Sequence, residues 1–207
     1  AFSHGEDLLD SYVPELLRPG IYHPDGQILE EVYVYGSFLQ SKMYRNNVKC
    51  SDCHNPHSLE LKAVGNALCG QCHDPKQYDV PAHHFHEVNT DGDQCINCHM
   101  PGKYYMVNDF RRDHSFRVPR PDLTVRYGTP NACNQCHTDK SAEWAADAVV
   151  DWYGPERAAH YSDALAAANT GDPTVMPELI QMAADTGIGE IVRATAVWLL
   201  SSSGDQQ

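Results

Sequence analysis

The sequence predicts a mostly α-helical protein with extensive loops, in which a helical tail follows a longer region of little regular secondary structure. Turn-forming pairs such as Pro19-Gly20 and Pro101-Gly102 interrupt the first two thirds of the chain. Helical spacing of apolar residues becomes clear only in the last third. All eight cysteines come before that point, and all three tryptophans come after it. We therefore expect two parts, residues 1–137 and residues 138–207.

The first part begins with an N-terminal arm that has little apolar core of its own. Residues 32–45, VYVYGSFLQSKMYR, could form a helix or an edge strand, and their second half favours a helix. The rest of this part is predicted to be loops and short helices, because apolar periodicity is weak there.

The tail is predicted to hold about four helices. The first, SAEWAADAVVDWYG, places apolar residues three and four positions apart, with Ser141 as its N-cap and Gly154 as its end. Pro155 and Pro173 suit the first turns of the second and third helices, where a backbone N–H is not needed. The fourth is GEIVRATAVWLL. The third and fourth together are similar to a helix pair of a HEAT-type array.

The charge of the chain argues against two classes of partner. The formal net charge is -13, with 15 lysine and arginine residues, so we expect no binding to nucleic acid or to an anionic membrane surface. No run of 18 apolar residues predicts a transmembrane segment. The N-terminus AFSHGEDLLD has neither the basic nor the apolar stretch of a secretion signal. We expect a soluble chain from which such a signal has been removed.

The cysteines form four Cys-x-x-Cys pairs, and a histidine follows each pair directly. Cys-x-x-Cys-His is the attachment sequence of c-type haem, in which both thiols bond to the porphyrin and the histidine binds the iron. Zinc bound by thiolates and a disulfide framework are the alternatives, but neither explains the repeated histidine. We therefore expect four c-type haems. The thioether cysteines would be Cys50, Cys53, Cys69, Cys72, Cys95, Cys98, Cys133 and Cys136. The proximal iron ligands would be His54, His73, His99 and His137.

Eight other histidines compete for the opposite, distal side of the four irons. This surplus favours bis-histidine ligation and low reduction potentials, with Met43 and Met106 as the methionine alternatives. Side chains three residues apart project to the same side, so His54 and His57 are not expected to share an iron. The same holds for the outer histidines of HHFH. The distal candidates are His57, His83, His86, His114, His23 and His4.

Haem propionates would make the loaded protein more acidic still, and buried carboxylates need partners. A guanidinium group matches a carboxylate with two hydrogen bonds. Four arginines lie within ten positions, either as propionate contacts or as a solvated basic loop. They are Arg111, Arg112, Arg117 and Arg120.

The unit CSDCHNPHS…LCGQCH resembles the doubled Cys-x-x-Cys-His motif of multihaem c-type cytochromes. The segment CINCHMP…RRDHSFRVPRPDL…GTPNACNQCHTDKSAEWAA resembles the C-terminal portion of large multihaem cytochromes that carry helical repeats. The resemblance covers residues 20–155 and implies distal roles for His57, His83, His86 and His114.

The larger cytochromes of this kind have further haem motifs upstream, which are absent from this sequence. Four haems in a small secreted chain are also similar to the tetrahaem cytochromes that polymerise into extracellular conductive filaments. In such a filament a sixth ligand can come from the adjacent subunit, and His4 or His23 would be the donor here.

These features favour electron transfer by four closely packed, mainly bis-histidine haems over catalysis. The alternative is a multihaem reductase or oxidase of a small nitrogen or sulfur compound, which needs one iron with an open position. Because haem attachment takes place outside the cytoplasm, we expect a periplasmic, cell-surface or extracellular protein. The expected partners are other redox proteins, extracellular electron acceptors or further copies of the chain, and the tail could serve as the docking module.

Overall fold

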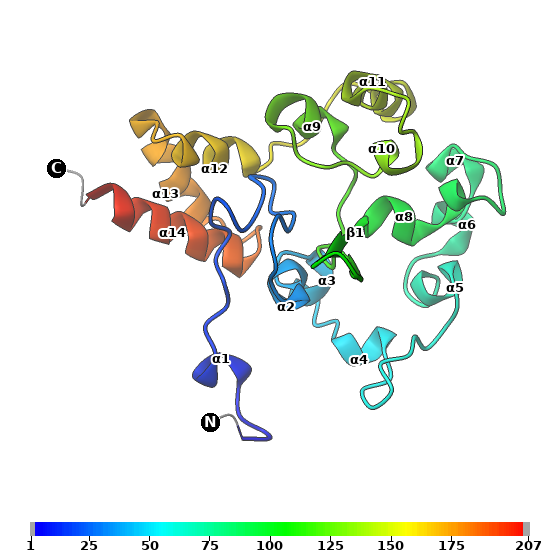
Figure 1. The fold of residues 1–207 in the computed structure, drawn as a ribbon, viewed down its shortest axis with the longest axis horizontal. Helices are drawn as coiled ribbons and strands as arrows, with labels where there is room; N and C mark the ends of the chain where they lie inside the picture. Colours follow the sequence, from blue (N-terminus) through cyan, green and yellow to red (C-terminus); the bar gives the residue numbers. More distant parts are fainter. Residues whose placement is uncertain (1–2, 205–207) are drawn as a thin grey trace. The chain divides into compact units, whose positions relative to one another are not determined.

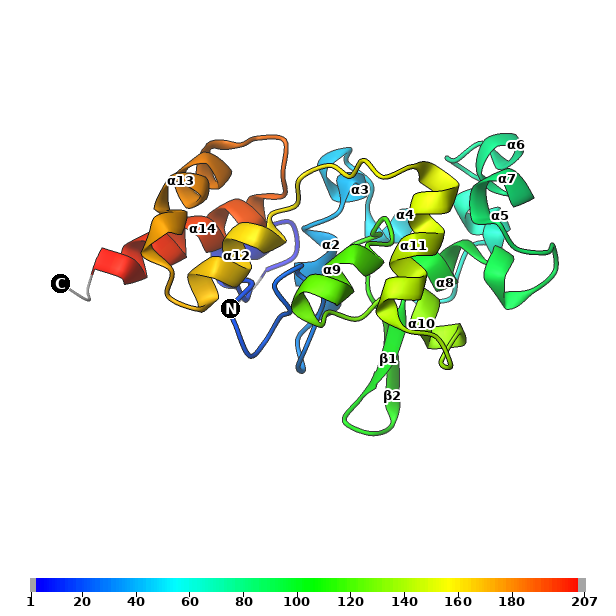
Figure 2. The ribbon, with the colours of Figure 1, turned by 90° about the horizontal axis from the view of Figure 1, so that it is seen from above.

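The computed structural model describes residues 3–204 of the chain (Figure 1, Figure 2). The chain folds as two compact units, residues 1–40 with residues 160–207, and residues 41–159. Helices and loops dominate both, which confirms the mostly α-helical class. None of the helices in the described range is long and apolar enough to cross a bilayer. The division expected from composition, at residue 138, differs from these units and stays a prediction.

The first unit is organised by its C-terminal helices. It contains α1 (Leu8–Ser11), α2 (Val34–Phe38), α12 (Ser162–Asn169), the 3-10 helix η2 (Pro173–Val175), α13 (Met176–Ala184) and α14 (Glu190–Gly204). Helices α13 and α14 lie side by side (Figure 1) and bury Leu179 and Val192. The N-terminal arm packs here as well, because Leu17 is buried and its N–H donates to Thr195 Oγ1 at 3.0 Å. The HEAT-type likeness of this helix pair stays a prediction.

The second unit contains all four Cys-x-x-Cys-His sequences. Its elements are α3 (Lys42–Arg45), α4 (Cys50–Cys53), α5 (Asn66–Cys69), α6 (Pro75–Tyr78), α7 (Pro81–His84), the 3-10 helix η1 (Asp91–Asp93), α8 (Cys95–His99), β1 (Gly102–Tyr105), β2 (Asp109–Arg112), α9 (Pro121–Tyr127), α10 (Cys133–Cys136) and α11 (Ala142–Tyr153). A core forms where α9 and α11 pack and bury Leu123 and Ala145. Residues 42–100, in contrast, contain no buried side chain.

Local signals located two of the predicted helical regions well. Helix α11 begins after Ser141, whose side chain accepts from the Trp144 N–H, and it ends at Gly154, as predicted. The stretch 32–45 forms α2 and α3, and the side chain of Ser41 caps the second of these.

The helix expected to begin at Pro155 was placed wrongly. Residues 154–160 are not helical, and α12 begins only at Ser162. The carbonyl of Ala158 accepts a hydrogen bond from Arg120 Nη1 at 3.0 Å, and Arg157 Nη2 donates back to the Val149 carbonyl at 2.8 Å. These two hydrogen bonds hold residues 157 and 158 next to Arg120 and to α11, in place of the hydrogen bonds of a helix.

Two short strands were not predicted. Strands β1 and β2 pair antiparallel, with Gly102 opposite Arg112, and the hairpin projects from its unit (Figure 2). Its turn contains no Asn-Gly or Asp-Gly signal. Met106 and Val107 adopt positive φ angles of 47° and 71° instead, a conformation that sequence alone does not indicate for these side chains.

Candidate haem-binding sites

Each Cys-x-x-Cys-His sequence forms about one turn of helix. Helices α4, α8 and α10 span the first, third and fourth cysteine pairs, and α5 ends at Cys69, the first cysteine of the second pair. Residues i and i+3 of such a turn lie on the same face, so the two thiols project together. The histidine N–H closes the turn on the carbonyl of the first cysteine, at 2.9 Å for His54, 3.0 Å for His73 and 2.9 Å for His137. One turn thus presents two thiols and an imidazole to one ligand.

Consecutive motifs are neighbours in space. Burial raises the pKa of the Cys53 thiol, and nearby charges, chiefly that of Cys69 in the second motif, raise it further. A hydrogen bond joins Cys69 to Cys95 of the third motif; it lowers the pKa of Cys69 to about 7 and raises that of Cys95. Burial raises the pKa of Cys98 as well, with a smaller effect from the cysteines of the fourth motif. The attachment sites therefore follow one another in the order of the sequence.

Asn66 fixes the contact between the second and third motifs. Its Nδ2 donates to Asp79 Oδ1 at 2.8 Å and to the Asp93 carbonyl at 2.9 Å. Its Oδ1 accepts from the Cys95 N–H at 2.9 Å. One amide thus bonds to three residues, Asp79 and the neighbouring Asp93 and Cys95, and holds α5 against the N-terminal end of α8.

Three of the four histidines expected as proximal ligands lie against a second histidine ring. The pairs, with the distance between ring centroids and the angle between ring planes, are His54 with His114 (6.4 Å, 30°), His83 with His99 (6.1 Å, 15°) and His86 with His137 (6.1 Å, 34°). A metal that takes one nitrogen from each imidazole at about 2 Å holds the centroids roughly 6 Å apart, because each centroid lies about 1 Å behind its nitrogen. Each pair thus has the separation of two axial ligands.

Backbone carbonyls set the tautomer of four of these histidines. The contacts are His54 Nδ1 with Leu59 O (2.9 Å), His99 Nδ1 with Arg117 O (2.6 Å), His114 Nδ1 with Arg112 O (2.9 Å) and His86 Nδ1 with His84 O. A carbonyl oxygen only accepts, so Nδ1 carries the hydrogen and Nε2 keeps its lone pair. This is the tautomer that binds a metal through Nε2, with its orientation fixed by the carbonyl.

His84 has the opposite tautomer. Its Nδ1 accepts from the His86 N–H at 3.2 Å, so its own hydrogen lies on Nε2. That Nε2 is buried and has no hydrogen-bond partner within the described range. A nitrogen that carries a hydrogen cannot bind iron. His84 Nε2 can therefore donate a hydrogen bond but cannot act as an axial ligand in this tautomer.

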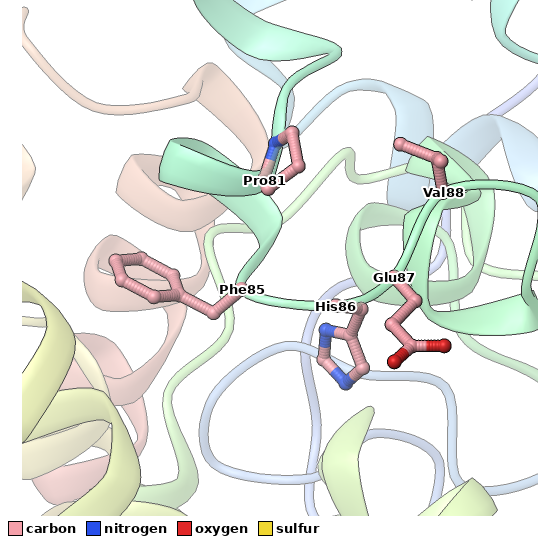
Figure 3. Close-up of a pocket in the computed structure, with 5 residues that line it drawn as sticks. All are labelled: Pro81, Phe85, His86, Glu87 and Val88. Atoms are coloured by element: carbon pink, nitrogen blue, oxygen red, sulfur yellow. The ribbon is translucent and has the colours of Figure 1, made fainter.

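The surroundings of the motifs fit a large bound group around which the side chains of this region could pack. The stretch 42–100 buries no side chain, although it carries three of the four motifs. An open hollow of ≈ 650 Å³, within the range of cofactor sites, adjoins the HHFH segment. Its lining residues are Pro81, Phe85, His86, Glu87 and Val88 (Figure 3). A haem propionate would also give the buried His84 Nε2 an acceptor. The residues present therefore fit haem.

Residues 44–78 match the family described as the doubled CXXCH motif. This segment contains the first two Cys-x-x-Cys-His sequences, and the match indicates covalently bound c-type haem. A solved structure, that of the outer cell wall cytochrome OcwA, aligns with a TM-score of 0.36 and 17% sequence identity. The alignment covers 81% of this chain and 44% of the OcwA chain, so the chain spans less than half the length of that cytochrome. Comparison with curated proteins gave no significant match.

The fourth proximal histidine, His73, has a different neighbour. The ring beside it is that of Tyr78, edge-on at 5.8 Å, and the same tyrosine lies edge-on at 5.4 Å to His83. No ring pair between His73 and another histidine occurs in the part of the chain that the structure describes. His57 is exposed, and its N–H bonds to Asn55 Oδ1 at 2.9 Å. The distal role expected for His57 stays a prediction.

Two further distal candidates, His4 and His23, belong to the first compact unit, whereas all four motifs lie in the second. Their roles as ligands, to this chain or to a second copy, also stay predictions.

All four arginines of the basic segment bond to groups of the chain. Their partners are Asp109 for Arg111, the Ile96 and Met100 carbonyls with Asn97 for Arg112, Asp113 for Arg117, and Asp122 with the Ala158 carbonyl for Arg120. With side chains 14% and 16% exposed, Arg117 and Arg120 do not form a solvated loop. Propionate contacts by these arginines stay a prediction. Each guanidinium group would have to bond to a propionate as well as to its present partners.

Sequence reasoning missed the aromatic residues of α11. Trp144 lies 4.9 Å from the His137 ring, Trp152 lies 5.9 Å from the His86 ring, and Tyr153 lies 6.4 Å from the His83 ring. These side chains fall after the expected boundary at residue 138, where they read as core residues of a helical tail. The sequence carries no signal that relates them to histidines so distant along the chain.

Proposed function

We propose that the chain carries single electrons between redox partners through four covalently bound c-type haems, held mainly by pairs of histidines. The proposal rests above all on the three histidine ring pairs, whose centroids are 6.1 to 6.4 Å apart. When bound, haem supplies reversible one-electron transfer at its iron. Two imidazoles on one iron leave no position for a substrate, which favours electron transfer over catalysis at these three sites.

The chain contributes orientation and order to this function. Carbonyl groups hold the imidazoles in the tautomer that binds iron. The hydrogen bond between Cys69 and Cys95, and the proximity of the other consecutive motifs, support a relay in which neighbouring haems lie close together in the sequence order of their motifs. Paired histidines in place of methionine also favour low reduction potentials.

A second candidate function depends on His73, which lies against Tyr78 and not against another histidine ring. An open position at this iron would suit a reductase or oxidase of a small nitrogen or sulfur compound. A histidine from a second copy, such as His4 or His23, could instead complete the site and link subunits into a filament. We infer an extracytoplasmic location in either case, with other redox proteins or extracellular acceptors as partners.

Added ligands separate these possibilities. The oxidised protein would be titrated with cyanide and with nitrite while the haem absorbance is followed. Electron transfer through bis-histidine haems predicts no change at three of the four haems. A change in about a quarter of the absorbance would show one open haem, as the neighbours of His73 lead us to expect, and turnover of nitrite or sulfite would support the enzyme. A change in most of the absorbance would contradict the proposed function.

A further inference from the structure

His83 and His86 are the first and last residues of HHFH. They lie against different proximal histidines, although they are only three residues apart. His83 pairs with His99, and His86 pairs with His137. Continued helix would project both side chains to one side. The chain must therefore turn between them.

That turn occurs at Phe85, which directly follows α7. Phe85 has a φ of 55° and a ψ of 27°, the left-handed conformation. Bulky side chains rarely adopt it, and surrounding structure must hold them there. In Figure 3 the side chains of Phe85 and His86, on either side of this turn's end, leave the backbone in different directions.

Helix α11 supplies the contacts that hold Phe85. Its ring is stacked on that of Trp152, with centroids 4.7 Å apart and planes 3° apart. Tyr153 lies edge-on to Phe85 at 5.5 Å, and its hydroxyl donates to the His83 carbonyl. Trp152 also touches the His86 ring, at 5.9 Å and 77°. Trp152 therefore contacts Phe85 and His86, and Tyr153 contacts Phe85 and His83.

We propose that Trp152 and Tyr153 are positioning residues that hold Phe85 in the left-handed conformation and so direct His83 and His86 to two different irons. This inference rests on the proposed function, since it assigns those histidines as axial ligands. The two aromatic side chains act through Phe85 and the histidine backbone, and they do not themselves bind iron. Trp152 also limits rotation of the His86 ring.

The test uses the haem-loaded full chain and the variant Trp152→Ala. Electron paramagnetic resonance and absorbance spectra would give the low-spin fraction, and intact mass would give the number of attached haems. We expect all haems to stay attached, because the thioether cysteines are untouched, while a quarter to a half of them lose low-spin character. Trp152→Phe should restore the low-spin spectrum. The matched control is Trp198→Ala, at a part-buried tryptophan of the first unit, which should keep the low-spin fraction of the unmodified protein.

A double variant separates positioning from general packing. Glycine adopts a positive φ freely, so Phe85→Gly should recover much of the low-spin fraction in the Trp152→Ala background. Phe85→Ala, which keeps the strain and loses the stack, should not. If Trp152→Ala keeps the low-spin fraction of the unmodified protein, the inference fails while the proposed function stands. It also fails if Trp198→Ala shows the same loss. Fewer than four attached haems in the unmodified protein would instead count against the proposed function.

Discussion

Replacing His114 by alanine should change the ligation of one haem and leave the others as they were. The His114 ring lies 6.4 Å from His54, and no other histidine ring is paired with His54 among residues 3–204. One haem in four, or about a quarter of the absorbance, should therefore become high-spin. The variant also loses the bond from His114 Nδ1 to the Arg112 carbonyl, which is worth about 0.5–1.5 kcal/mol. That loss is small beside a typical stability of about 5–15 kcal/mol, so the fold should persist.

The assay is electron paramagnetic resonance of the oxidised protein at matched haem concentration, with and without added imidazole. Imidazole should restore the low-spin signal, because the free ligand can occupy the space of the removed side chain. The matched control is His160→Ala, which removes a part-buried histidine of the first unit that is not among the distal candidates. His114→Ala with the low-spin fraction of the unmodified protein, or His160→Ala with a new high-spin haem, would refute the pairing of His114 with His54.

Three further predictions concern the second unit, the first unit and His84 in turn. Asn66→Ala should lower the free energy of unfolding by about 2–4 kcal/mol in urea titrations, because three hydrogen bonds are lost; an unchanged midpoint would contradict the role of this amide. Leu179→Ala, at a side chain 1% exposed in the first unit, should cost about 2–5 kcal/mol without altering the haem spectrum, and a new high-spin band would show that the units are not independent. His84→Phe should leave the low-spin fraction unchanged, since the Nε2 of His84 carries a hydrogen; loss of a low-spin haem would make His84 a ligand.

Local features of the structure followed from the sequence, and contacts between distant segments did not. Ser141 and Gly154 bound α11 because capping depends on residues within one turn. The Cys-x-x-Cys-His turns are local for the same reason. The pairing of His54 with His114 depends on how separate segments pack, so the histidine surplus left several partners open.

The contacts of α11 with the histidine rings could not be predicted for a related reason. Its aromatic residues have helical spacing, which predicts a buried face but does not identify what the face covers. The hairpin of β1 and β2 escaped prediction because its strands have four residues each and its turn lacks the usual residues. Outside the motifs, residues 46–100 showed weak apolar periodicity, as expected of a chain that packs around a bound group and not around its own side chains.

The central claim is that each Cys-x-x-Cys-His sequence holds one haem through two thioether bonds. Intact mass spectrometry of the denatured protein, with a pyridine haemochrome assay on the same sample, tests it most directly. The account predicts four haems per chain that remain attached after denaturation, and no free thiol. Fewer than four haems, or thiols released together with zinc on denaturation, would contradict it.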